Sequence, residues 1–368
     1  MKTGYLINIL LILLVLLFNP FDKQIEAKDI QLGGQLDVSL QGFCNNEIGF
    51  AFQPQANLDL ELFLPRWKNN EIKCAGTFYT NITENKIDFF WKRLYWKHRF
   101  EHLHLTIGRQ PVSWSFGSLL NPVDYTLGSV AMDEEFSSKY QDAVEIYIPV
   151  NWNTNLSVVA SLPDATKDLK AGLRGRTLIK DFDLTFNYVQ EQPDGEKGIE
   201  KRFGITAKGD IGKFGVYGAF GFYWNRENQF SLLAGADYSY FFQKGNRLYL
   251  QAEYLNIPPG LLSQITGQTM LVTEEYFDKN MHLFVSNISY QIDDFSSISL
   301  TSFFNCSNGS KMFTSSYINQ IKNNTALEIK AGLASESTKY SDINSSPLNL
   351  FPGESYQLFL EAGISYVF

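Results

Sequence analysis

Residues 358–368 read LFLEAGISYVF, and this stretch decides the fold class. Glu361, Gly363 and Ser365 are at odd-numbered positions of the chain. The even-numbered positions are apolar, namely Leu358, Leu360, Ala362, Ile364, Tyr366 and Phe368. Because successive side chains of a β-strand point to opposite faces, this alternation predicts a strand with one apolar and one polar face.

The same alternation recurs from residue 33 onward, and each segment is followed by a turn rich in Gly, Asn, Asp or Lys. We predict about eighteen strands in one all-β domain, an even number as single-chain bacterial membrane barrels require. Three of these segments, 86–97, 279–291 and 310–321, alternate poorly, so sixteen strands are an alternative. The predicted strands span 33–43, 54–64, 72–82, 86–97, 101–111, 138–149, 154–163, 168–179, 181–191, 200–210, 213–223, 229–242, 246–257, 279–291, 296–306, 310–321, 325–337 and 355–368.

The predicted connections fall into two length classes. If the last strand runs toward one side of a membrane, that side holds short turns such as 180–181 and 293–296. The opposite side holds the long stretches 112–137, 258–278 and 338–354. Short turns on one side and long loops on the other are typical of outer-membrane barrels.

The N-terminus predicts export. Lys2 precedes an apolar run over 5–18, and 25–27 offers a cleavage site. A run of about fourteen residues is shorter than the roughly twenty that a membrane-spanning helix needs. We therefore predict a cleaved signal peptide over 1–27 and a mature barrel over 28–368, with an uncleaved anchor as the alternative.

Composition supports β-structure and narrows the list of partners. Aromatic residues make up 15% of the chain, with 30 Phe and 19 Tyr beside 27 Gly and only 12 Pro, a bias that favours sheets with aromatic girdles. Cys44, Cys74 and Cys306 are too few and too scattered for a disulfide framework. The net charge of −8 argues against a nucleic-acid partner.

The C-terminal strand resembles the assembly signal of outer-membrane β-barrel proteins, a terminal Phe preceded by aromatic or aliphatic residues at alternate positions. Together with the export signal, this resemblance favours a closed barrel in the bacterial outer membrane over a soluble β-sandwich or propeller. It implies outer-membrane lipid and the barrel assembly machinery, acting through the last strand, as partners. The sequence does not indicate whether barrels associate with one another.

Residues 107–124 read IGRQPVSWSFGSLLNPVD and resemble a GRQ-x-[VI]-x-W-[GS]-x-G then N-P-x-D stretch of porin-like and alginate-export-type outer-membrane proteins. The resemblance implies that the loop at about 112–137 folds inward and narrows a pore. Pro111, Gly117 and Pro122 would also take the chain out of the barrel wall. We expect Arg109 to contact a loop carboxylate, either facing solutes or only anchoring the loop. The constriction would contain Arg109, Trp114, Asn121, Asp124, Asp133 and Glu134.

Lumen-facing positions predict two charged walls. A basic wall on 168–179 and 200–210 contains Lys170, Arg174, Arg176, Arg202 and Lys208. An acidic wall, offset only by Lys330, contains Asp37, Asp59, Glu61, Glu328 and Glu361. The two walls would face each other and create a transverse field that orients dipolar or zwitterionic solutes. The alternative is that these charges pair locally with neighbours such as Asp183.

These observations predict a porin-type channel for diffusion of small hydrophilic solutes. The alternative is a structural or adhesive outer-membrane barrel without an open pore. We expect no enzymatic activity, no catalytic residues and no cofactor. We also expect no metal site, because His102 and His104 lack an evident third ligand and 133–135 lacks the spacing of a calcium loop.

Overall fold

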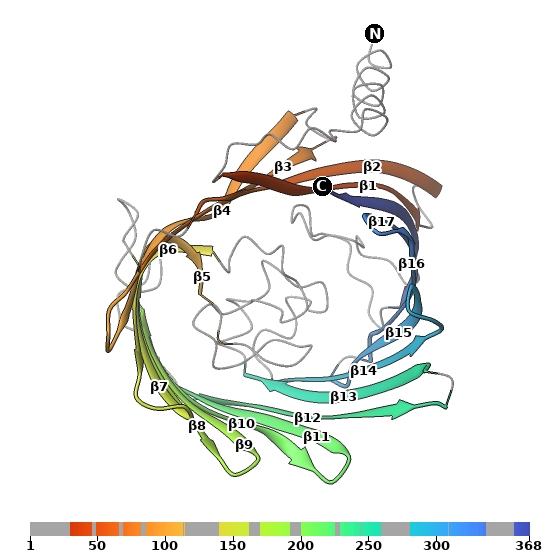
Figure 1. Cartoon of the computed structure of the whole chain (residues 1–368). Helices are drawn as coiled ribbons and strands as arrows, with labels where there is room; N and C mark the ends of the chain where they lie inside the picture. Colours follow the sequence, from red (N-terminus) through yellow and green to blue (C-terminus); the bar gives the residue numbers. More distant parts are fainter. Residues whose placement is uncertain are drawn as a thin grey trace.

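The computed structural model describes residues 30–45, 49–65, 69–81, 86–112, 114, 140–161, 170–191, 200–224, 229–243, 245–258, 280–307, 309–335 and 357–368. They form one closed sheet of 18 antiparallel strands, in which each strand pairs with the next and β18 pairs with β1 (Figure 1). The prediction of a single all-β barrel is confirmed, and the strand number is 18 rather than 16. The predicted signal peptide over 1–27 lies outside the described residues.

The strands closely follow the predicted segments. Their bounds are Gln31–Asn45 (β1), Gly49–Phe63 (β2), Asn70–Asn81 (β3), Lys86–Arg99 (β4), His104–Pro111 (β5), Tyr140–Pro149 (β6), Thr154–Ser161 (β7), Ala171–Ile179 (β8), Phe182–Glu191 (β9), Glu200–Ile211 (β10), Phe214–Trp224 (β11), Gln229–Phe241 (β12), Arg247–Ile257 (β13), Met281–Gln291 (β14), Ser296–Asn305 (β15), Lys311–Lys322 (β16), Thr325–Ser335 (β17) and Gln357–Val367 (β18).

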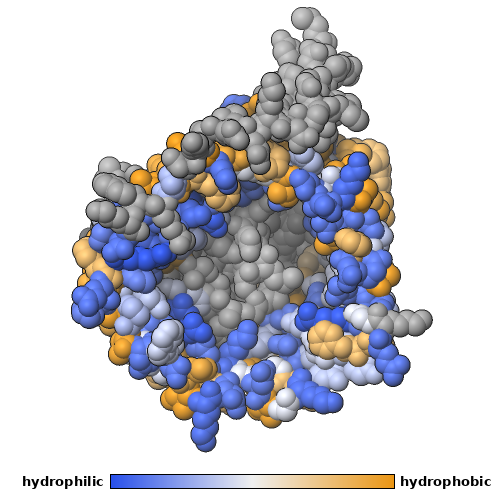
Figure 2. Space-filling view, viewed as in Figure 1, coloured by the Kyte–Doolittle hydropathy of each residue, from blue (hydrophilic) through white to orange (hydrophobic). Residues whose placement is uncertain are grey.

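The two faces of the sheet differ as the alternation requires. Large apolar side chains are exposed on the outer flank, among them Phe186 at 48%, Leu360 at 44% and Ile364 at 48%. The residues that alternate with these apolar ones along each strand point into the ring, and they include charged residues such as Asp183 and Glu361. Figure 2 shows hydrophobic atoms on the outer flank and hydrophilic atoms around the opening. An apolar exterior of this kind is suited to lipid.

The seam between the first and last strands closes on a glycine. The Gly34 N–H donates to the Phe368 carbonyl oxygen over 3.1 Å, and the Phe368 N–H donates back to Gly34 over 3.0 Å. A Cβ at Gly34 would lie 2.3 Å from the Asp59 carbonyl oxygen and 2.7 Å from the Phe368 ring. Gly34 therefore leaves room for the terminal phenylalanine to approach the seam closely.

The connections give the barrel two distinct ends. Turns such as 180–181, 212–213 and 323–324 lie at the end where β1 begins and β18 finishes, which we call the short-turn end. The stretches 112–139, 258–280 and 336–356 join strands at the opposite, long-connection end. Within the described ranges, no helix is long and apolar enough to cross a membrane.

Candidate functional site

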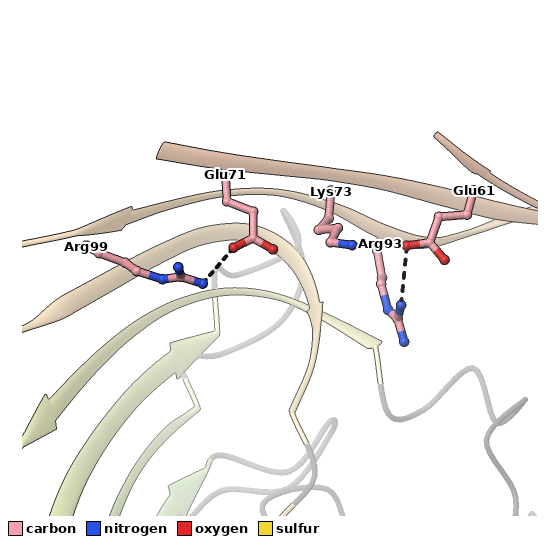
Figure 3. Close-up of polar contacts among 5 residues, drawn as sticks. All are labelled: Glu61, Glu71, Lys73, Arg93 and Arg99. Carbon is pink, nitrogen blue, oxygen red and sulfur yellow. Dashed lines mark hydrogen bonds and ion pairs between the residues drawn. The ribbon is translucent and has the colours of Figure 1, made fainter. Parts of the chain in front are cut away.

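Seven charged side chains of β2, β3 and β4 form a group on the lumen wall, which we call the charged strip. Asp59 accepts hydrogen bonds from Lys92 Nζ at 2.8 Å and 2.9 Å. Glu61 is shared by two cations of the strip. Its Oε1 lies 3.3 Å from Lys73 Nζ and 3.9 Å from Arg93 Nη1. Arg99 Nη2 donates to Glu71 Oε2 over 2.8 Å. Figure 3 shows the side chains of Glu61, Glu71, Lys73, Arg93 and Arg99 directed to the same side of the sheet.

A β-bulge in β4 makes the strip richer in cations than alternation predicts. The register passes from Ala75 opposite Arg93 to Gly76 opposite Trp91, so Lys92 is an additional residue. Lys92 reaches Asp59 and Arg93 reaches Glu61, so both consecutive cations lie on the lumen side. The strip therefore holds four cations against three carboxylates. Bulges change side-chain direction in this way in many sheets.

The predicted acidic wall is accordingly mixed in sign. Asp59 and Glu61 belong to the charged strip, and Lys330 Nζ lies 3.0 Å from Glu328 Oε2. Asp37 accepts a hydrogen bond from the Gln35 amide over 2.8 Å, and Glu361 lies opposite Lys330 in the β17–β18 register. The sequence predicts only Lys330 as an offset to these acids, and the cations Lys73, Lys92 and Arg93 of β3 and β4 correct that prediction.

The residues of the predicted basic wall also have acidic neighbours. Glu191 on β9 receives Lys170 Nζ at 2.7 Å and Arg202 Nη1 at 2.5 Å. Arg176 Nη2 lies 2.5 Å from Asp183 Oδ2. The two remaining cations lie in register with polar residues of β9, Lys208 opposite Asp183 and Arg174 opposite Asn187. Local pairing, the alternative to a strong transverse field, is therefore present on both walls.

Exposure separates the Glu191 cluster, which comprises Glu191, Lys170 and Arg202, from the charged strip. The Arg202 side chain is 3% exposed and the Glu191 side chain 18%. In the charged strip the Glu61 side chain is 28% exposed and the Arg93 side chain 40%. A passing solute would therefore meet the charges of β2–β4 more readily than those of the Glu191 cluster.

The conspicuous GRQP sequence marks the place where β5 leaves the wall. Gly108 has a φ of +122°, and a Cβ there would lie 2.3 Å from the Leu94 carbonyl oxygen. β4 pairs with β5 only as far as Arg109, whereas β5 and β6 stay paired up to Pro111. Figure 1 shows β5 displaced toward the inside of the ring. Only glycine tolerates both this φ and this close approach.

Arg109 stabilises this separation of β5 from β4. Its Nε donates to the Trp91 carbonyl oxygen over 2.7 Å, and its guanidinium lies over the Phe90 ring at 4.8 Å. Its Nη1 donates to Asp142 Oδ2 on β6 over 3.0 Å. Asp142, the carboxylate beside Arg109 in the described part of the chain, is not one of the loop carboxylates that the sequence predicts. Asn121, Asp124, Asp133 and Glu134 lie outside the described residues.

The chain beyond β5 starts on the lumen side. Val112 and Trp114 are buried, at 4% and 6% exposure, in a cluster with Ala143, Val159 and Val189. Ala143 and Val159 alternate with exposed neighbours on β6 and β7 and are fully buried, and Val189 is 1% exposed. These three side chains face the lumen, so Val112 and Trp114 cover part of the inner wall. The rest of the predicted loop up to residue 137 lies outside the described part of the chain.

Comparison with known proteins places the fold. Neither a protein-family model nor a curated protein matches the sequence. Among solved structures, OprB of Pseudomonas putida has a TM-score of 0.55 at 9% identity, over 95% of this chain and 97% of that one. OccK2 of Pseudomonas aeruginosa, solved with glucuronate, has a TM-score of 0.55 at 10% identity, over 92% and 96%. Wzi of Escherichia coli, described as a carbohydrate-binding β-barrel involved in group 1 capsule assembly, has a TM-score of 0.59 at 11% identity, over 94% and 86%.

The fold is that of an outer-membrane, porin-like β-barrel. At such identities these likenesses establish the fold alone, and residue roles have to come from the lumen itself.

Proposed function

We propose that this protein is an integral outer-membrane channel for passive diffusion of small hydrophilic solutes. The observation that carries the proposal is a closed ring of 18 strands, apolar outside, whose charged strip keeps side-chain exposures between 13% and 40%. Barrels of about 16–18 strands are wide enough to hold an aqueous channel. Charged groups that remain hydrated inside such a ring mark where water, and solutes with it, would pass.

The solute path would run along β1–β4 and β17–β18. The Glu328 and Lys330 side chains are 38% and 34% exposed, comparable with the charged strip. Because ion pairs neutralise much of both walls, we infer that any field across the lumen is weaker than unpaired walls would give. Its main source would be the cation excess of β3 and β4.

The loop at about 112–137 would narrow this path. The proposal is supported by the positive φ of Gly108, the anchoring of Arg109 and the burial of Val112 and Trp114 against the inner wall. Asn121, Asp124, Asp133 and Glu134 remain proposed constriction residues.

Planar-bilayer recording of the refolded protein tests the function. We expect discrete conductance steps, and liposomes carrying the protein should swell in neutral sugars up to a size cutoff. Matched liposomes with heat-denatured protein are the control. A barrel that inserts, migrates as a folded species and stays electrically silent would contradict the channel proposal.

A closed, carbohydrate-binding barrel is the second candidate. Lumen-facing apolar side chains of β12–β14 are buried, with Leu233 at 0%, Leu255 at 1% and Val285 at 1% exposure, so part of the inner wall does not line open water. The likeness to Wzi adds weight to this reading. Silent bilayers combined with retention of the protein on immobilised polysaccharide would favour it.

Export and assembly complete the proposal. We propose cleavage of 1–27 by signal peptidase and insertion by the barrel assembly machinery through β18. N-terminal sequencing of protein from outer-membrane fractions should begin near Lys28. Removal of Phe368, which seals the seam at Gly34, should reduce the amount of folded barrel.

A further inference from the structure

A cavity of about 390 Å³ lies at the short-turn end, between β13, β14 and β15. Its lining comprises Arg247, Tyr249, Ser289, Gln291, Asp293, Asp294, Phe295, Ser296 and Ser297. Register places Arg247 opposite Gln291 and Gln291 opposite Ser297, so these three side chains share the lumen face. A volume of a few hundred Å³ is typical of small-molecule sites.

Arg247 is held in place without a carboxylate. Its Nη2 donates to Ser239 Oγ over 3.0 Å, and its guanidinium lies 5.6 Å from the Phe241 ring and 5.5 Å from the Tyr249 ring. Most other lumen cations described above pair with an acid, whereas Arg247 forms no ion pair with any residue of the described ranges. A fixed guanidinium with free donors is prepared to receive an anionic group.

Two carboxylates line the same cavity without neutralising Arg247. Asp293 and Asp294 belong to the turn between β14 and β15, about one to two strand spacings, or roughly 5–10 Å, from β13. Asp293 Oδ1 accepts the Phe295 N–H over 2.8 Å. That hydrogen bond lowers the pKa of Asp293, so this carboxylate stays ionised at neutral pH. The cavity therefore presents separated positive and negative groups.

The floor between the opposite charges is small and polar. Ser289, Ser297 and Gln291 supply hydroxyl and amide groups that can donate or accept hydrogen bonds. Bulky side chains here would fill the gap between Arg247 and the turn, but serines leave it open. A ligand bridging the gap needs an anion and a cation a few ångströms apart.

We propose that this cavity binds a zwitterionic solute of amino-acid size, with its carboxylate at Arg247 and its ammonium group at Asp293 and Asp294. The site goes beyond the proposed channel function, because occupancy at the short-turn mouth does not require an open pore. It lies apart from the constriction proposed at β5.

Isothermal titration of the detergent-folded barrel with L-serine tests the proposal. N-acetyl-L-serine lacks the ammonium group, L-serine methyl ester lacks the carboxylate, and glucose lacks both charges. We expect L-serine to bind at least about tenfold more tightly than any of these three probes. Arg247→Gln and the double variant Asp293→Asn/Asp294→Asn should each weaken L-serine binding about tenfold.

Arg176→Gln is the matched control, since Arg176 is an exposed lumen arginine already paired with Asp183. It should leave L-serine binding unchanged, and all variants should keep the heat-dependent gel migration of a folded barrel. Equal binding of L-serine and N-acetyl-L-serine would overturn the zwitterion proposal in favour of a plain anion site. Absence of L-serine binding to folded wild-type protein would overturn the site altogether, whatever the conductance experiments show.

Discussion

Glu191 on β9 and Glu61 on β2 are each shared by a lysine and an arginine, yet the two clusters differ in tightness. Lys170 and Arg202 approach Glu191 to 2.7 Å and 2.5 Å. The corresponding cations of Glu61 stand at 3.3 Å and 3.9 Å.

Burial follows the same division. The Arg202 side chain is 3% exposed, and the arginine of the Glu61 cluster, Arg93, is 40% exposed. Charges removed from water must be paired closely to offset desolvation, whereas hydrated charges tolerate loose pairing. The comparison teaches that the Glu191 cluster stabilises the barrel wall and that the Glu61 cluster is available to solutes.

The largest expected effect comes from removing a side chain that covers the inner wall at β6, β7 and β9. Trp114→Ala should reduce the free energy of unfolding by about 3–5 kcal/mol, because a large buried side chain is lost from the cluster with Ala143 and Val159. It should also raise unit conductance by widening the path. Urea titration and bilayer recording measure the two effects.

Trp152→Ala is the matched control, since Trp152 is fully exposed in the β6–β7 turn. Its stability and conductance should stay at wild-type values. A Trp114 variant with wild-type conductance would remove this side chain from the constriction.

Replacing the arginine of each cluster compares the contributions of the Glu191 and Glu61 clusters to stability. Arg202→Met should cost about 3 kcal/mol, because it leaves the poorly exposed Glu191 with Lys170 as its remaining partner in the pair. Arg93→Met should cost less than about 1 kcal/mol, as exposed pairs do. Urea unfolding monitored by tryptophan fluorescence gives both values, and equal losses would show that burial does not distinguish the Glu191 cluster from the Glu61 cluster.

The separation of β5 from β4 depends on a backbone that other residues rarely adopt. Gly108→Ala should cost about 1–3 kcal/mol, because its φ is +122° and the new Cβ would meet the Leu94 carbonyl oxygen. Gly175→Ala is the control, with its nearest neighbouring atom 4.0 Å away. Thermal unfolding followed by gel migration should rank the Gly108 variant clearly below the Gly175 variant.

The smallest effect concerns selectivity. Arg93→Gln removes one hydrated cation of the charged strip and should raise the cation-to-anion permeability ratio by about twofold, equivalent to about 0.4 kcal/mol for a screened charge. Lys201→Gln is the control. Lys201 precedes the inward-facing Arg202 and therefore lies on the outer face of the barrel, so its loss should leave the ratio unchanged. Reversal potentials in a salt gradient provide the measurement. An unmoved potential in the Arg93 variant would place the solute path elsewhere.

The individual strands could be located from the sequence because period two is a local property. Most strands have an apolar outer face and a more polar inner face, so their alternation is clear. Even the poorly alternating segments 86–97, 279–291 and 310–321 are strands, since closure of the ring requires every member to be paired. The bulge at Lys92 explains the weak pattern of the first of them.

The contacts of the candidate site could be predicted only in part from the sequence. Gly108, Arg109 and Trp114 stood out in the sequence, but the pairing of Arg109 with Asp142 depends on how β5 and β6 align. The cations Lys92 and Arg93 could not both be assigned to the lumen, because strict alternation sends consecutive residues to opposite faces.

The spacing of residue types along the chain is enough to predict an all-β chain whose strands have one apolar and one polar face, because this alternation is local. Only the folded barrel shows which charges meet, which are buried and that Arg247 lines the same cavity as Asp293 and Asp294 without pairing with them. Ion-pair distance and burial depend on strand register, bulges and ring closure. Those relations join residues that are far apart in sequence, and no local pattern records them.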